Sequence, residues 1–91
     1  MMYDFCKYPD GTEVVFSGIR INEAGEETVR VCFERPTDEG FDTIIFELPS
    51  YKILRKDGNF TEEEIERFRT VVERGVQDFF EWAREGGVHI A

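Results

Sequence analysis

The sequence predicts an α+β fold in which an antiparallel β-meander is covered on one face by a single long C-terminal helix. Residues 1–56 contain strand-like runs that are separated by short turns rich in proline, glycine and aspartate. Residues 61–85 repeat apolar side chains every three or four positions, as one face of a helix does. A chain of 91 residues forms one domain around one hydrophobic core.

Four strands are expected, with a fifth at the edge of the sheet. The first turn, Tyr8–Thr12, contains a proline that presets φ and a glycine that accepts positive φ. The cleanest alternation puts Val29, Val31 and Phe33 on one face. Short loops between neighbouring strands indicate antiparallel pairing. The predicted strands are residues 2–8, 13–21, 27–35, 41–48 and, as the shorter edge strand, 51–55.

The helix has clear start and stop signals. Thr61 is a good N-cap, and Glu64 lies at the position that completes a capping box. Gly86 and Gly87 end the apolar pattern. Gly75 interrupts the helix. We interpret this glycine as a point of close packing on the sheet in preference to a kink.

Charge excludes several kinds of partner. Twenty acidic side chains against eleven basic ones give a net charge of −9. We therefore expect no direct binding to nucleic acid or to an anionic membrane, because both need a basic surface. The N-terminus lacks the pattern of a signal peptide and no run is long enough to span a bilayer, which predicts a cytoplasmic protein. Cys6 and Cys32 are then expected to be free thiols, although their spacing leaves a disulfide open.

No catalytic, cofactor-binding or metal-binding motif is present, and we expect none of these sites. The only histidine, His89, lies near the C-terminus, where residues 88–91 form either a free end or a short strand. Acidic residues gather in turns that a meander places at one end of the sheet. Carboxylates suit hard cations, but the spacing of an EF-hand is missing, so cation binding stays open. These residues are Asp10, Asp38, Glu39 and Asp42.

The candidate interaction surface consists of Phe79, Phe80 and Trp82. A helix over 61–85 extends roughly 36 Å, whereas an eight-residue strand extends roughly 25 Å. The helix is therefore expected to overhang the sheet and to expose these rings, unless the tail or residues 51–55 cover them.

These features predict a non-enzymatic, acidic protein-interaction or regulatory module that forms a homodimer. One alternative is a DNA mimic, or an antitoxin-like or immunity-like inhibitor of a basic protein. A second alternative is small-molecule binding or an enzymatic role between sheet and helix.

Overall fold

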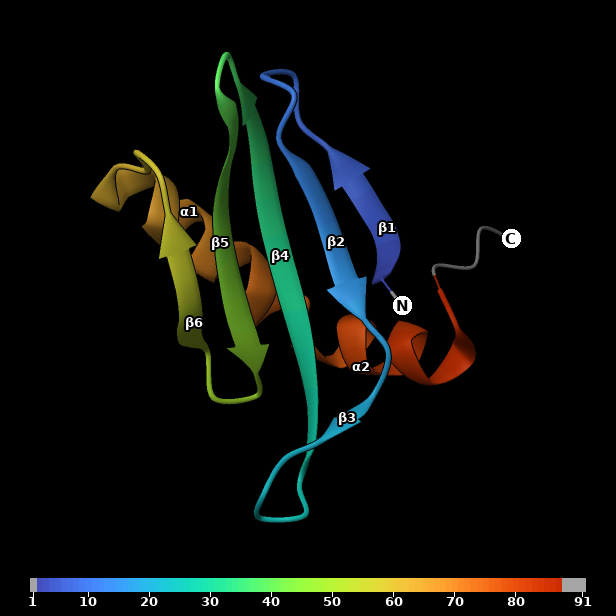
Figure 1. The fold of residues 1–91 in the computed structure, drawn as a ribbon. Coiled ribbons are helices and arrows are strands. Elements are labelled where there is room, and N and C mark those ends of the chain that lie inside the picture. The colour runs from blue at the N-terminus through green and yellow to red at the C-terminus, as the bar shows by residue number, and fades with distance from the viewer. Residues whose placement is uncertain (1, 88–91) are drawn as a thin grey trace.

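The computed structural model describes residues 2–87 and confirms the α+β class, with a six-stranded antiparallel sheet followed by two helices (Figure 1). The predicted alternatives for residues 88–91, including His89, lie outside the described residues. The elements are β1 (Met2–Lys7), β2 (Glu13–Ser17), β3 (Arg20–Ile21), β4 (Glu27–Thr37), β5 (Gly40–Leu48), β6 (Lys52–Asp57), α1 (Glu62–Arg74) and α2 (Val76–Glu85).

The sheet is a meander with the order β1-β2-β4-β5-β6, and the predicted edge strand is β6. The run predicted as one strand over residues 13–21 is two strands, β2 and β3, and both pair with the long β4. The β2–β4 ladder ends where a side chain replaces a backbone acceptor, because Oγ of Ser17 accepts the Arg30 N–H at 2.9 Å. Beyond this point the chain resumes pairing at Arg20, opposite Thr28.

Alternation along the strands puts the core on the face that the helices cover. Phe33 stacks on Phe68 of α1 with ring centroids 4.2 Å apart, and it meets Phe46 edge-on at 5.8 Å. The sheet side of this core is fully buried and almost wholly aliphatic or aromatic. Its members are Val14, Phe16, Val29, Val31, Phe33, Ile44, Phe46 and Leu48.

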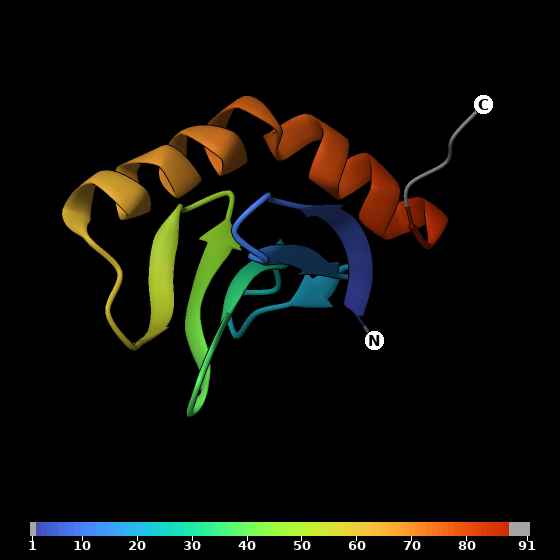
Figure 2. The ribbon, with the colours of Figure 1, turned by 90° about the horizontal axis from the view of Figure 1, so that it is seen from above.

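The helix predicted as one rod is broken at Gly75, which has φ −98° and ψ 7°. Hydrogen bonds still pass through the break, from the Gly75 N–H to the Val71 carbonyl and from the Phe79 N–H to the Gly75 carbonyl. A Cβ at Gly75 would lie 3.1 Å from the Phe79 ring and 3.2 Å from the Val71 oxygen. A side chain at this position would therefore collide with atoms of the two helices and not with the sheet. The preferred interpretation, close packing on the sheet, was wrong, and the chain bends at Gly75 (Figure 2).

The two helices cross the strands, with α1 over β5 and α2 over β2 and β4 (Figures 1 and 2). Comparing helix length with strand length therefore does not predict an overhang, because the helices span the width of the sheet and not its height. Neither helix within residues 2–87 is long and apolar enough to span a bilayer.

The predicted start of α1 is confirmed. Oγ1 of Thr61 accepts the Glu64 N–H at 3.1 Å, and Oε1 of Glu64 accepts the Thr61 N–H at 3.0 Å, which completes the capping box. The end of α2 is confirmed as well, since Gly86 adopts φ 83° in the left-handed region. The capping box fixes the position of the Glu64 carboxylate, which also takes part in the cluster described next.

Candidate interaction groove

Arg35, near the end of β4, joins three parts of the fold. Its Nη2 lies 2.9 Å from Oδ2 of Asp42 on β5, and its Nη1 pairs with Glu64 on α1. Nη2 also donates to the Asn59 carbonyl at 3.2 Å, and the guanidinium lies 4.6 Å from the centroid of the Phe60 ring. This cluster ties the beginning of α1 to the sheet.

The predicted acidic end of the sheet exists, but a guanidinium occupies it. Asp42 binds Arg35, and Asp10 is close enough for the Arg35 charge to help lower the pKa of its carboxyl. Asp38 and Glu39 lie exposed at the β4–β5 turn. Within residues 2–87, no group of three or more histidine, cysteine or acidic side chains is arranged to hold a metal ion.

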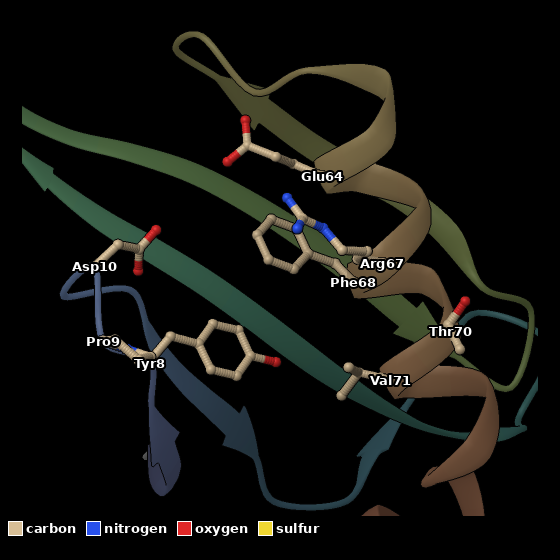
Figure 3. Close-up of a pocket in the computed structure, with 8 residues that line it drawn as sticks. All are labelled: Tyr8, Pro9, Asp10, Glu64, Arg67, Phe68, Thr70 and Val71. Carbon is tan, nitrogen blue, oxygen red and sulfur yellow. The ribbon is translucent and has the colours of Figure 1, made fainter.

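A groove of about 580 Å³ lies between the β1–β2 turn and α1 (Figure 3), and we call it the hairpin–helix groove. One wall comes from the turn, which Asp10 shapes by accepting the Thr12 N–H at 2.9 Å. The other wall is α1, held in place by the Arg35 cluster. The lining residues are Tyr8, Pro9, Asp10, Glu64, Arg67, Phe68, Thr70 and Val71.

The floor of the groove is aromatic. The rings of Tyr8 and Phe68 are nearly parallel, with an interplanar angle of 11° and centroids 6.4 Å apart. The Tyr8 hydroxyl points across the groove toward Val71 (Figure 3). Because Phe68 also stacks on the buried Phe33, the floor is continuous with the core and is held rigidly.

One end of the groove is acidic. The pKa of the Asp10 carboxyl is lowered, first by the Thr12 N–H, and that of Glu64 is lowered, first by the Thr61 N–H. Both groups are therefore ionised at neutral pH. A neighbouring hollow on α1 shares Arg67 with the groove and adds three more carboxylates. Two of these carboxylates are partly neutralised, since Glu64 pairs with Arg35 and Glu66 lies 3.5 Å from Nε of Arg69. The charged residues that line the two hollows are Asp10, Glu62, Glu63, Glu64, Glu66 and Arg67.

The predicted interaction residues do not form one exposed patch. Phe79 is 1% exposed and belongs to the core, where its ring contacts Phe5 at 5.1 Å and Phe16 at 5.4 Å. Trp82 is half-buried against the same two rings. Phe80 is half-buried beside Arg84, whose guanidinium lies 5.6 Å from its ring. The strand that covers these rings is β1, whereas the sequence analysis had considered only the tail and residues 51–55 as a cover. Because Phe79 is buried in this way, it is excluded as an interaction residue.

Among the groove residues, the sequence analysis proposed only Asp10 as a candidate ligand-binding residue. The available signal was Val71, which lies beside the main apolar stripe of the helix and widens it. Comparisons with protein-family models, with curated proteins and with solved structures found no match. The function is therefore argued from the geometry alone.

Both cysteines are free thiols, as expected. Cys32 is 3% exposed, and burial, together with the neighbouring Glu34 carboxylate, raises its pKa to about 12. Burial also raises the pKa of the half-buried Cys6. The thiolate is the nucleophilic form of cysteine, so neither residue has the environment of a reactive thiol.

We expect iodoacetamide at pH 8 to label Cys32 about 100-fold more slowly in the native protein than in urea, because the thiolate is scarce and the sulfur is covered. Mass spectrometry of the digested protein at successive times measures both rates. Equal rates in the two conditions would show that Cys32 is accessible in the folded protein.

Proposed function

We propose that this protein is a non-enzymatic interaction module that binds a basic segment of a partner protein in the hairpin–helix groove. The observation that carries the proposal is an aromatic floor bordered by ionised carboxylates. An apolar side chain of the partner packs on Tyr8 and Phe68, and flanking lysines or arginines face the acidic end. An antitoxin-like or immunity-like inhibitor of a basic protein would use the same surface.

The energetics suit a moderate, salt-sensitive interaction. Burying an apolar side chain on the floor contributes about 25 cal/mol per Å² of apolar surface removed from water. The carboxylates at the rim are solvated, so they mainly speed the encounter and select against acidic partners. Screening by salt weakens this contribution once separations exceed about 8–10 Å.

The titratable groups of the groove support binding over proton transfer. A general acid or base works best with a pKa near the operating pH. The carboxyl pKa values of Asp10 and Glu64 are shifted downward, away from neutrality. Burial raises the pKa of the Tyr8 phenol, so it stays protonated. Each group is thus held in one charge state.

The size of the groove supports a second candidate, the binding of a small apolar molecule. Its volume of about 580 Å³ lies within the range of ligand pockets. A DNA mimic has less support, because arginines interrupt the acidic residues along both helices. These arginines are Arg67, Arg69, Arg74 and Arg84.

Two synthetic peptides test the proposal, each with a central phenylalanine, one flanked by lysines and the other by glutamates. We expect the lysine peptide to bind in a fluorescence anisotropy titration and to weaken as salt is added. Val71→Arg, which puts bulk and positive charge into the groove, is expected to weaken binding about tenfold or more. Asp10→Asn keeps the amide oxygen for the Thr12 N–H and is expected to weaken binding about threefold.

Gln77→Arg is the matched control, because it makes the same change of charge at an exposed position of α2 outside the groove. It is expected to leave the affinity within about twofold of the wild type. Equal binding of the two peptides, or wild-type binding by the Val71 variant, would refute the proposal. Binding of uncharged indole at the groove with neither peptide bound would favour the small-molecule candidate.

A further inference from the structure

A second hollow, of about 540 Å³, lies at the same end of the sheet as the hairpin–helix groove, and the proposed function does not use it. Its walls are the β4–β5 turn, with Asp38, Glu39 and Phe41, and the loop before α1, with Gly58 and Asn59. We call it the tip hollow. The groove and the tip hollow share this end because the β1–β2 and β4–β5 turns both close it (Figure 1).

A single guanidinium separates the tip hollow from the groove. Arg35 pairs with Glu64, which lines the acidic end of the groove. The same side chain binds the Asp42 carboxylate at 2.9 Å and the Asn59 carbonyl at 3.2 Å, and both of these residues line the tip hollow. The two hollows are therefore neighbours, and the acidic end of the groove is the end that adjoins the tip hollow.

The tip hollow has an aromatic ring in water. Phe41 is 64% exposed, whereas the other eight phenylalanines, all within residues 2–87, are buried or half-buried. Alternation along β5 turns Asp42 toward the helix side, where Arg35 holds it, and Phe41 toward the opposite face. The tip hollow thus lies across the end of the sheet, and a partner segment that leaves the groove over this end passes Phe41.

Two carboxylates beside this ring supply a charge that the molecule itself leaves uncompensated. Asp38 and Glu39 are exposed, and neither forms an ion pair with another residue of the range 2–87. No basic residue lines the tip hollow. A ring next to free carboxylates suits a guanidinium, which stacks on aromatic faces and donates two parallel hydrogen bonds to a carboxylate. The ammonium of lysine is more strongly hydrated and lacks the planar fork.

We propose that the tip hollow binds an arginine of the same partner whose basic segment lies in the hairpin–helix groove. This inference rests on the proposed function and adds a second contact to it. The guanidinium stacks on Phe41 and pairs with Asp38 or Glu39, while an apolar side chain of the partner packs on the floor of the groove. Because the two contacts belong to one segment, the second forms at a high effective concentration once the first has formed.

Extended versions of the lysine peptide test the tip hollow. Each carries a flexible glycine–serine spacer of about six residues, which reaches roughly 13 Å, and ends in arginine, lysine or serine. Both ends of every peptide are blocked, and the extension is placed at the N-terminus in one set and at the C-terminus in another. In the better of the two directions, we expect the arginine peptide to bind about fivefold more tightly than the serine peptide, and the lysine peptide only about twofold, in the anisotropy titration.

Phe41→Ser and Asp38→Arg are each expected to remove the gain from arginine and to leave the affinity of the unextended peptide within about twofold of the wild type. The opposite end of the sheet provides matched controls, because Ile21 is 65% exposed and Glu23 lies in the exposed β3–β4 turn. Ile21→Ser and Glu23→Arg make equivalent changes there and are expected to keep the gain. Circular dichroism checks that every variant is folded.

The unextended peptide reports on the groove, and the gain from arginine reports on the tip hollow. Equal binding of the arginine and serine peptides, or a gain that survives both Phe41→Ser and Asp38→Arg, overturns the inference and leaves the groove proposal intact. A gain from lysine as large as that from arginine overturns the assignment of a guanidinium site. An unextended peptide that does not bind overturns the proposed function together with the inference that rests on it.

Discussion

Gly58→Ala is expected to lower the free energy of unfolding by about 2–4 kcal/mol and the melting temperature by about 10–20 °C. Gly58 adopts φ +103°, a region that strains any residue with a Cβ. The added carbon would also lie 2.8 Å from Cβ of Asp42 and closer still to its carboxylate. The carboxylate must then move away from Arg35, which loosens the cluster that holds the beginning of α1.

Two variants separate the strain from the collision. Gly25→Ala has a similar φ of +79° but meets no atom within 4 Å, so it is expected to cost only about 1 kcal/mol. Asp42→Gly removes the whole obstacle, the Cβ included, and in that background Gly58→Ala should cost little more than Gly25→Ala does. Equal costs for Gly58→Ala with and without Asp42 in a double-mutant cycle would show that the two residues do not interfere.

Phe79→Ala is expected to lower the free energy of unfolding by about 3–5 kcal/mol, because it leaves a ring-sized cavity in the core. The ring is 1% exposed, and its aromatic neighbours come from β1, β2 and α2. The loss should therefore weaken contacts between the last helix and the two strands at the β1 edge of the sheet. Urea denaturation followed by far-ultraviolet circular dichroism measures it.

The adjacent residue provides the control. Phe80 is half-buried and touches the core from its edge, so Phe80→Ala is expected to cost less than about 1.5 kcal/mol. If the two variants had equal and small effects, Phe79 would be a surface residue, as the sequence had indicated. A large effect at Phe80 alone would mean that Phe80, and not Phe79, is the α2 residue that packs in the core.

Local signals predicted most of the fold. The capping box, the left-handed Gly86 and the alternation of Val29, Val31 and Phe33 each depend on residues close together in the sequence. The break at Gly75 was harder to predict, because a helix-interior glycine is compatible with both close packing and a bend. The split of β2 from β3 depends on one hydroxyl, Oγ of Ser17, which takes the place of a backbone acceptor.

The candidate site was predicted less well because it depends on which distant segments meet. The position of Phe5 under α2 decides that Phe79 and Trp82 are covered, and this follows from the direction in which the helices cross the sheet. The acidic turns were correctly expected at one end of the sheet. Their cation, Arg35, was not foreseen, because its strand position gave no sign of its partner Glu64 on α1.

The meander also has a consequence for how the chain folds. Each ladder joins strands that follow each other in the sequence, apart from the two-residue β3 between β2 and β4. Pairing of this kind closes short loops, so the entropy lost before contacts form is small. Packing of α2 on β1 is different, because it brings together segments from the two ends of the described chain. The sheet is thus expected to assemble outward from the β4–β5 hairpin, with docking of α2 on β1 as the long-range step that completes the native state.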